Sequence, residues 1–244
     1  MENTLPTTFE FELSGDYALF SDPITRPGGE KNTLMVPTYE ALKGAVKSCY
    51  WKPTLVWFID EVRIMNPFRT ETKGVKLRKY GASENVYDLA NFTYLKDVRY
   101  QVRAHYEWNM NRPDYFAVDR DYKKHNCIMA RSLKAGGRFD IFLGTRECQA
   151  SIKKCVFGEG EGFYDSIDEL ALGNMYHSTL YPDEATKECN KGLIVRNFWK
   201  PVMEYGVIKF PRPEECKSSV VIREMEMKKF TNPHTAGGGE DELV

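Results

Sequence analysis

The stretch Asp97-Val-Arg-Tyr-Gln-Val-Arg-Ala-His-Tyr-Glu-Trp108 decides the fold. Every second residue in it is apolar, and the residues between them are polar with a basic bias. Successive side chains of a strand point to opposite faces of its sheet, so this period of two predicts a long strand with one apolar and one polar face. The protein should therefore contain a β-sheet, and the neighbouring segments indicate its type.

The segments before this strand predict two further strands and a helix. Phe9–Leu13 alternates like a half-buried strand, and Gly15–Pro23 has the composition of a loop. A helix is predicted within Pro37–Pro53, because a Pro-Thr start signal precedes apolar residues at helical spacing and a proline ends them. Thr54–Met65 follows as a strand whose first half is apolar.

The segments after the decisive strand complete the order. A shorter helix is predicted over Lys124–Leu133, closed by Gly136-Gly137, and Phe139–Leu143 is predicted to be a strand. Strand, helix, strand, strand, helix, strand is the order of a ferredoxin-like (RRM-like) α+β domain. The basic stretch Arg63–Phe92 would then be an inserted loop or hairpin.

After residue 155 the predicted strands are short and alternate with turns, which predicts a second unit. We expect residues 1–155 to form the ferredoxin-like domain and residues 156–230 to form a small antiparallel β domain. Residues 231–244 are Gly-rich and then acidic, which predicts a disordered tail. The strand candidates of the second unit are short and lie between turns that contain Pro or Gly: Ile194–Trp199, Val207–Phe210 and Val220–Ile222.

Charge is segregated along the chain, although its formal sum is -1. Residues 63–79 hold six basic side chains and one acidic one, and residues 94–138 hold ten basic and five acidic ones. From Val156 to Asn190 the sign reverses, with eight acids against Lys187 alone. Such a protein can present a basic face to a polyanion while it stays near neutral overall. Charges scattered over a solvated surface would give the same sequence, so both interpretations stay open.

Cysteine usage and the N-terminal residues predict a reduced, cytoplasmic protein. The six cysteines show no CxxC pair and no zinc-finger spacing with histidine. Residues 1–13 contain no apolar stretch that could serve as a signal peptide, and no run approaches the length of a transmembrane helix. We therefore expect no association with a membrane.

Phosphate-binding and metal-binding motifs are missing from the sequence. There is no Walker loop and no dinucleotide fingerprint, so we expect no cofactor. Asp119 and Asp121 form a D-x-D pair, which a turn between strand and helix explains better than a metal site does. His105, His177 and His234 are far apart and lack ligand-like neighbours. We expect no metal, and a metal-dependent DNA nuclease is the weaker alternative.

Lys123-Lys124-His125-Asn126 is the first segment suited to chemistry, because it stands where a helix begins. Backbone N–H groups and the helix dipole favour a phosphate there. Lys124 would add a fixed positive charge, and His125 would add a group that exchanges protons near neutral pH. RNA cleavage needs such a set: a proton acceptor for the 2′-hydroxyl, a proton donor for the leaving oxygen and a cation for the phosphorane. A solvated basic turn would have the same sequence.

Tyr50-Trp51-Lys52-Pro53, at the end of the first predicted helix, is the second candidate segment. Aromatic packing against the sheet explains Trp51. Tyr50 differs, because a ferredoxin-like fold packs both helices on one side of its sheet. The end of the first helix could then approach the start of the second, where His125 is expected.

The third candidate is the loop Leu133-Lys-Ala-Gly-Gly-Arg138. Gly136 and Gly137 would let the backbone come close to a phosphodiester, and Lys134 and Arg138 would anchor it. A plain helix cap explains the two glycines equally well.

Several motifs occur in a fixed order along the chain: Gly15-Asp-Tyr-Ala-Leu-Phe-Ser-Asp-Pro23, Pro37-Thr-Tyr-Glu-Ala-Leu-Lys-Gly44, Tyr50-Trp-Lys-Pro53, Ser132-Leu-Lys-Ala-Gly-Gly-Arg138, Asp140-Ile-Phe-Leu-Gly144 and Phe210-Pro-Arg-Pro-Glu214. In this order they resemble the CRISPR-associated Cas-five family. The likeness is to its subtype I-C branch, called Cas-five-d or the Dvulg type. It extends from about Phe9 to about Met225, which is nearly the whole chain.

The resemblance implies an RNA-binding and catalytic ferredoxin-like domain, followed by a small sheet domain. In most relatives this subunit only caps the 5′ handle of the guide RNA, whereas in the subtype I-C branch it is itself the endonuclease. The catalytic set of that branch is a tyrosine at the end of the first helix and a Lys-His pair that opens the second. By motif these fall on Tyr50, Lys124 and His125. Lys123 also precedes the histidine here and could share or take the role of the lysine.

The implied function is metal-independent cleavage of precursor CRISPR RNA within the repeat by 2′-hydroxyl attack, leaving a 2′,3′-cyclic phosphate. The protein would stay on the 5′ handle of the mature crRNA and join the other Cascade subunits in antiviral defence, with target DNA as a further candidate partner. The main alternative is a handle-binding subunit without chemistry. The sequence leaves open which residue is the acid and which the base. The expected RNA-binding residues are Arg69, Lys73, Lys76, Arg99, Arg103, Lys123, Lys134, Gly136, Gly137 and Arg138.

Overall fold

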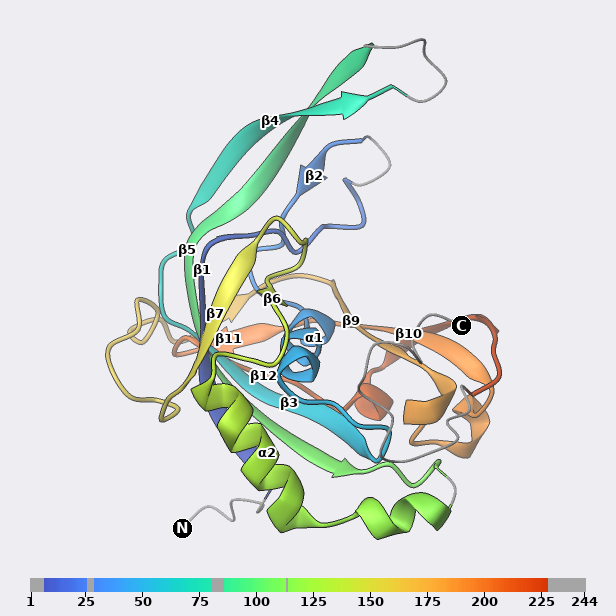
Figure 1. The fold of residues 1–244 in the computed structure, drawn as a ribbon. Helices are drawn as coiled ribbons and strands as arrows, with labels where there is room; N and C mark the ends of the chain where they lie inside the picture. The colour runs from blue at the N-terminus through green and yellow to red at the C-terminus, as the bar shows by residue number, and fades with distance from the viewer. Residues whose placement is uncertain (1–6, 26–28, 80–85, 113, 228–244) are drawn as a thin grey trace.

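One long strand organises the main sheet of the computed structural model, which describes residues 7–25, 29–79, 86–112 and 114–227 (Figure 1). This strand, β5 (Tyr87–Trp108), pairs antiparallel with β1 (Thr8–Ala18) on one side and with β3 (Leu55–Ile64) on the other. Its even-numbered residues from Val98 to Tyr106 are all buried. The apolar face predicted from the period of two is therefore confirmed.

The main sheet is mostly antiparallel. From edge to edge, the order is β6, β7, β1, β5, β3, β12, β11, β8, and each neighbouring pair in this order is antiparallel. β2 pairs parallel with β5, and β4 pairs antiparallel with it. A sheet of this kind with few helices makes the protein α+β. The strands not yet placed are β2 (Lys31–Asn32), β6 (Ile141–Phe142), β7 (Gln149–Lys154), β8 (Leu170–Ala171), β11 (Val202–Glu204) and β12 (Val207–Lys209).

Two helices lie against the buried face of β5 (Figure 1). α1 (Tyr39–Cys49) begins at its N-cap Thr38, whose side chain accepts a hydrogen bond from the N–H of Ala41. α2 (Tyr122–Lys134) begins two residues earlier than the sequence predicts. The reason is Asp121, whose carboxylate accepts hydrogen bonds from the N–H groups of Lys123 and Lys124 and so caps the helix there.

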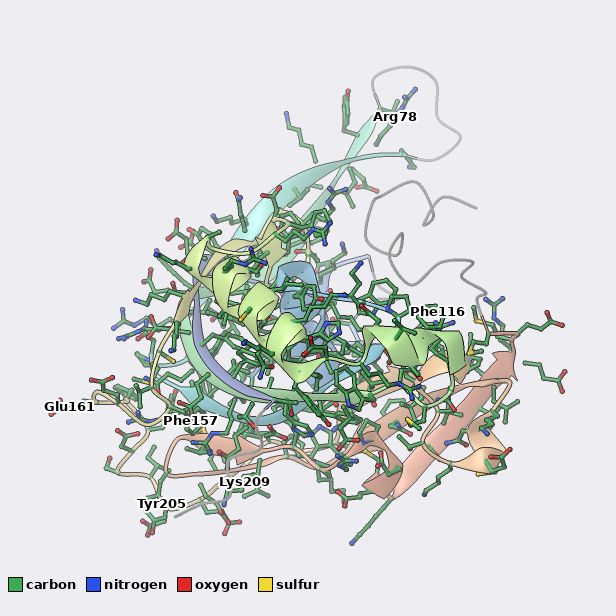
Figure 2. The ribbon with its side chains drawn as sticks, turned by 60° about the horizontal axis from the view of Figure 1, so that its bottom comes forward. Arg78, Phe116, Phe157, Glu161, Tyr205 and Lys209 are labelled. Carbon is green, nitrogen blue, oxygen red and sulfur yellow. The ribbon has the colours of Figure 1, made fainter. Side chains whose placement is uncertain are left out.

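The basic insertion is a hairpin. β4 (Thr70–Arg78) pairs along the first half of β5, from Thr70 opposite Leu95 to Arg78 opposite Tyr87. The hairpin projects away from the rest of the sheet in Figure 1, and Arg78 is labelled near its far end in Figure 2. Basic side chains on it are thus held well away from the two helices.

The polar face of β5 is covered as well, although its alternation predicted a polar surface. Gln101 and His105 are buried, and the Gln101 side-chain amide donates to the carbonyl of Glu159. Arg63 also faces inward, where its guanidinium bonds the Asp165 carboxylate and the Gly160 carbonyl. The acidic segment with Phe157 and Glu161 therefore lies across the sheet from α2 (Figure 2).

The C-terminal part contributes to both sheets. β9 (Met175–Leu180), β10 (Leu193–Trp199) and β13 (Ser218–Glu224) form a second, three-stranded antiparallel sheet in the order β13, β10, β9. Two of the three predicted C-terminal strands are thus confirmed in place. Short 3₁₀ turns connect these strands: η3 (Pro182–Glu184), η4 (Glu188–Asn190) and η5 (Pro213–Glu215).

Three expectations from the sequence are wrong. Val207–Phe210 was expected in the separate C-terminal sheet, but Val207–Lys209 pairs with β3 in the main sheet. Gly15–Pro23 was expected to be a loop, but β1 continues to Ala18 because it pairs with β5 through Leu95. Phe139–Leu143 was expected to be a full strand, but only Ile141–Phe142 is extended, and β7 is the strand that pairs with β1. The predicted tail 231–244 lies outside the described residues.

Candidate active site

The end of α1 packs against α2 beneath the sheet, and the Tyr50 side chain extends from there to the start of α2. Tyr50 follows α1 directly, and its carbonyl accepts a hydrogen bond from the Trp57 indole N–H at 2.8 Å. The Ser132 hydroxyl of α2 donates to the carbonyl of Cys49 at 2.6 Å, which fixes the two helices to each other. The Tyr50 side chain then reaches His125 in the first turn of α2, so the approach inferred from the helix order is present.

A chain of hydrogen bonds runs from Tyr50 through His125 to Asp119. The Nε2 atom of His125 lies 2.6 Å from the carbonyl oxygen of Asp119, which can only accept. Nε2 therefore carries the proton in the neutral ring, and Nδ1 accepts from the Tyr50 hydroxyl at 2.7 Å. The geometry gives each ring nitrogen one defined role, a donor toward Asp119 and an acceptor toward Tyr50.

Lys124 is held at the same place by the Asp119 carboxylate. The Lys124 ammonium contacts one carboxylate oxygen, and the Thr54 hydroxyl donates to the other at 2.6 Å. The Asp119 side chain is 1% exposed, whereas the Lys124 side chain is 38% exposed. Of this pair, the lysine is the charge that a ligand from solvent would meet.

Burial and charge set the protonation states of the site. Burial lowers the pKa of His125, so the imidazole is neutral at pH 7. Burial raises the pKa of Tyr50, which keeps its hydroxyl protonated. Burial also acts to raise the pKa of Asp119, but hydrogen bonds from Lys124 and Thr54 outweigh it and leave the carboxyl ionised. The resting site thus holds a phenol, a neutral imidazole, a carboxylate and an ammonium group.

Access to the imidazole is closed on the protein side. His125 is 0% exposed and Tyr50 is 1% exposed. The rings of Trp108 and Tyr106 lie edge-on to the imidazole, at centroid distances of 5.4 and 6.2 Å. Nε2 is hydrogen-bonded to the Asp119 carbonyl and Nδ1 to the Tyr50 hydroxyl, so proton exchange with a ligand at Nδ1 passes through that hydroxyl or requires Tyr50 to move.

A shallow pocket beside Tyr50 collects the third candidate segment. Tyr50 lines it together with Gly137 and Arg138 and with Arg131 and Ser132 of α2. Gly136 and Gly137 have φ values of 84° and 106°, a left-handed backbone that favours glycine at the end of α2. The structure thus brings Gly137 and Arg138 to the pocket that Tyr50 lines, whereas Lys134 and Gly136 stand beside it in the chain and do not line it. Lys123 is exposed in the first turn of α2.

The hairpin residues lie elsewhere. Arg69, Lys73 and Lys76 lie on or beside β4, on the projecting hairpin. Arg69 and Lys76 are exposed, and the Lys73 ammonium lies 3.4 Å from the centroid of the Tyr17 ring. They can meet a long polyanion but not the same phosphate as Lys124.

Arg99 and Arg103 are on the opposite face of the sheet from His125. They are odd-numbered residues of β5, whereas the even-numbered Tyr106 and Trp108 contact the imidazole. Arg99 pairs with Glu12 at 2.8 Å. Arg103 pairs with Glu10 at 3.0 Å and with Glu61 at 2.7 Å. The structure does not bring these two arginines to the site.

Sequence reasoning missed Asp119 and Lys52 as members of the site. Asp119 was explained as a turn residue, and only Asp121 acts as one, through its helix cap. Lys52 follows Tyr50 along the chain. Burial lowers its pKa, and the charges of Arg138 and Lys124 add to this effect. A helix start with aspartates both two and four residues before its first lysine is the signal that could have marked Asp119.

The described residues show neither a metal-binding cluster nor a membrane-spanning helix. Within the described residues, no three His, Cys, Asp or Glu side chains gather in a way that could hold a metal ion. None of the six cysteines, all of which lie in the described part, forms a disulfide. No described helix combines the length and the hydropathy needed to cross a membrane.

Comparisons with known proteins agree on one family. The family model of a CRISPR-associated protein, Cas_Cas5d, matches residues 8–211. The CRISPR pre-crRNA endoribonuclease Cas5d of Mannheimia succiniciproducens is 29% identical over 190 residues, which cover 69% of this chain and 78% of that protein. A crystal structure of a CRISPR-associated protein superposes with a TM-score of 0.72 at 34% identity. A functionally uncharacterized protein of Streptococcus mutans superposes at 0.70 and 37%. Each of these two alignments covers 87% of this chain and 96% of the other.

Proposed function

This chain belongs to the CRISPR-associated Cas5d family, and on that premise we propose that it is an endoribonuclease that cleaves precursor CRISPR RNA within the repeat. The similarity to a protein named as a pre-crRNA endoribonuclease supports this assignment. The observation that carries it is the hydrogen bond between Tyr50 and His125, with the Lys124 ammonium beside it. The three residue types expected from the family resemblance thus form one cluster.

The fold supports a ferredoxin-like domain as the frame of this site. Four strands of the main sheet stand in the order β7, β1, β5, β3, with α1 after β1 and α2 after β5. This order supports the proposal of a strand-helix-strand-strand-helix-strand domain, with β4 and the first half of β5 as its inserted hairpin. We place the ferredoxin-like domain in residues 1–155 and a small β domain in residues 156–230. Strands β8, β11 and β12 of the second domain then pair within the main sheet.

The mechanism that fits the site is attack by the RNA 2′-hydroxyl on the adjacent phosphate. The 2′-oxygen loses its proton and bonds to phosphorus, and the bond from phosphorus to the 5′-oxygen breaks as that oxygen gains a proton. The neutral imidazole of His125 can take up the proton of the 2′-oxygen by way of the Tyr50 hydroxyl, which passes its own proton to Nδ1. The Lys124 ammonium or the imidazolium so formed can give a proton to the 5′-oxygen. The Lys124 ammonium stabilises the negative charge of the phosphorane. The products are a 2′,3′-cyclic phosphate and a 5′-hydroxyl.

The protein alone should cleave repeat RNA in the presence of a chelator. The mechanism uses only protein side chains, so removal of divalent cations should leave the rate unchanged for an RNA whose fold does not depend on them. Mass spectrometry of the products should show a cyclic phosphate on one fragment and a 5′-hydroxyl on the other. Loss of cleavage with the chelator, or a 5′-phosphate product, would contradict the mechanism.

RNA binding is proposed to use the hairpin, the two ends of α2 and the loop after α2, through Arg69, Lys73, Lys76, Lys123, Lys134 and Arg138. Replacing Lys76 by alanine should weaken RNA binding and reduce the salt slope of the affinity by about 0.7, because one phosphate contact is lost. Arg103→Ala is the matched control, since Glu10 and Glu61 already hold that guanidinium. Filter binding over a range of salt concentrations measures both. Equal slopes for wild type and Lys76→Ala would remove the hairpin from the proposal.

After cleavage, the protein is proposed to stay on the 5′ handle of the crRNA and to join the other Cascade subunits. The basic hairpin and the pocket beside Tyr50 offer two separated contacts for one RNA, which supports retention of the product. A handle-binding subunit without chemistry is the second candidate. The burial of Tyr50 and His125 favours it, because a purely structural hydrogen bond would be buried in the same way.

A further inference from the structure

Asp119 contributes a carboxylate to the centre of the site, and the family resemblance assigns no role to it. It lies at the end of the 3₁₀ segment η2 (Asp114–Asp119), just before α2. Its carboxylate accepts from the Lys124 ammonium and from the Thr54 hydroxyl, and its carbonyl oxygen accepts from His125 Nε2 at 2.6 Å. Each of its side-chain oxygens therefore has a defined partner in the protein.

The carboxylate of Asp119 is buried, which explains why it needs these partners. A buried carboxylate is costly unless hydrogen bonds and an opposite charge compensate it. Only one of the partners of Asp119, Lys124, is a cation that also reaches solvent. Thr54 stands directly before β3, so the carboxylate also connects the sheet to α2. Asp119, held in this way, can fix the side chains of Lys124 and His125 relative to each other.

We propose that Asp119 is a positioning residue, whose carboxylate holds the Lys124 ammonium beside the Tyr50–His125 pair while its carbonyl oxygen fixes the imidazole ring. This inference rests on the proposed function, because it assigns a role within that same site. Asp119 does not touch the RNA. It acts through Lys124, which contacts the phosphate, and through His125, whose protonated form its negative charge favours.

Asp119→Asn is the variant that tests the role, because asparagine keeps the shape and removes the charge. Single-turnover cleavage should fall by about a hundredfold, the typical cost of misplacing a reacting group by about 1 Å. RNA affinity should stay the same or rise slightly, since a negative charge is lost near the RNA. Asp60→Asn is the matched control. Asp60 pairs with His105 at 2.8 Å on the other face of β5, and its variant should cleave at the wild-type rate.

The pH profile separates positioning from a loss of stability. The charged and titratable groups around His125 are Tyr50 at the end of α1, Tyr106 of β5, and Asp119, Asp121, Tyr122 and Lys124 around the start of α2. Removing the Asp119 charge should lower the pKa of His125 further. The acidic limb of the cleavage rate should therefore move to lower pH in Asp119→Asn and stay in place in Asp60→Asn.

Two further measurements keep the inference testable in every case. If Asp119→Asn does not fold, Thr54→Val removes one hydrogen bond to the carboxylate and should shift rate and pH limb in the same direction by less. NMR titration of His125 in the free protein needs no cleavage. It therefore tests the effect of the Asp119 charge on the pKa of His125 even if the wild type proves inactive on RNA. Wild-type rate and pH limb in Asp119→Asn, or an unchanged His125 titration, would overturn the inference.

Discussion

His125→Ala should lower the single-turnover rate of repeat-RNA cleavage by about 10²- to 10⁴-fold, the usual contribution of a positioned acid or base. The affinity for the same RNA should change little, because it is distributed over many phosphate contacts and the imidazole is fully buried. Chemistry and affinity should therefore separate in this variant. Quench-flow cleavage with saturating protein and an independent binding titration measure the two quantities.

His105→Ala is the control for this experiment. His105 is a buried histidine with a carboxylate partner, Asp60, but it lies on the opposite face of β5. Its replacement should leave the cleavage rate near the wild-type value. If His105→Ala is the inactive variant, or if His125→Ala cleaves at the wild-type rate, the site has been placed wrongly and the structural-subunit alternative gains support.

Tyr50 and Lys124 should behave differently from His125. Tyr50→Phe removes only the hydroxyl that donates to Nδ1 and keeps the buried ring, so a fall in rate would assign the hydroxyl a part in proton transfer. Lys124→Ala should reduce the rate and also weaken binding somewhat, because its charge acts on the phosphate in both the ground state and the transition state. Lys123→Ala shows whether the preceding lysine shares that role.

Glu184→Gln should destabilise the protein by about 3–5 kcal/mol, because it leaves a buried lysine without its counter-ion. Glu184 contacts the ammonium groups of Lys43 and, at 2.6 Å, of Lys47, both on α1. The side chain of Lys43 is 2% exposed, so water cannot replace the lost carboxylate. The loss is a large part of the roughly 5–15 kcal/mol that keep a typical domain folded. Urea denaturation measures it.

Glu188→Gln is the matched control. Glu188 pairs with Lys191 on the surface, and an exposed pair contributes about 0–1 kcal/mol. Equal denaturation midpoints for the Glu184 and Glu188 variants would contradict the account of the buried pair.

Lowering the pH should destabilise the protein in the same way as Glu184→Gln, because it protonates the Glu184 carboxylate. Burial acts to raise the pKa of Glu184, but Lys43 and Lys47 outweigh it and lower the pKa to about 2 from 4.5. The carboxylate then contributes stability that is fully present above pH 4.5 and is lost as the pH falls toward 2. Glu184→Gln should lack this part of the pH dependence.

Local sequence patterns predicted those elements whose apolar residues lie on one face. β5 and α1 show clear periods for this reason, although the polar face of β5 is covered as well. The second half of β5 and the whole of α1 were found where the pattern placed them. β7 has only one buried residue, Ile152, in six, and its two apolar residues, Ala150 and Ile152, make an alternation too short to predict a strand. β12 has three residues, and its pairing with β3 is decided by a contact across more than 140 positions of the chain.

The candidate site was predictable where helix ends define it. Tyr50 and His125 stand at such ends, and the packing of α1 and α2 on one face brings them within hydrogen-bond distance. Asp119 depends on how η2 turns into α2: the two aspartates before Lys123 are a local signal, but they do not tell which one caps the helix and which one pairs with Lys124. Arg99 and Arg103 show the converse limit. Charge counting marked them as RNA ligands, but only the fold reveals that Glu10, Glu12 and Glu61 are their neighbours.

The most direct test of the central claim is cleavage of a repeat RNA that carries a single 2′-deoxynucleotide 5′ to the scissile phosphate, once the cut site is mapped on the unmodified RNA. The proposed reaction uses that 2′-oxygen as its nucleophile. The wild-type protein should therefore bind the modified RNA as tightly as the unmodified one and leave it uncut. Efficient cleavage of the deoxy substrate would mean that water is the nucleophile, and the proposed mechanism would be wrong.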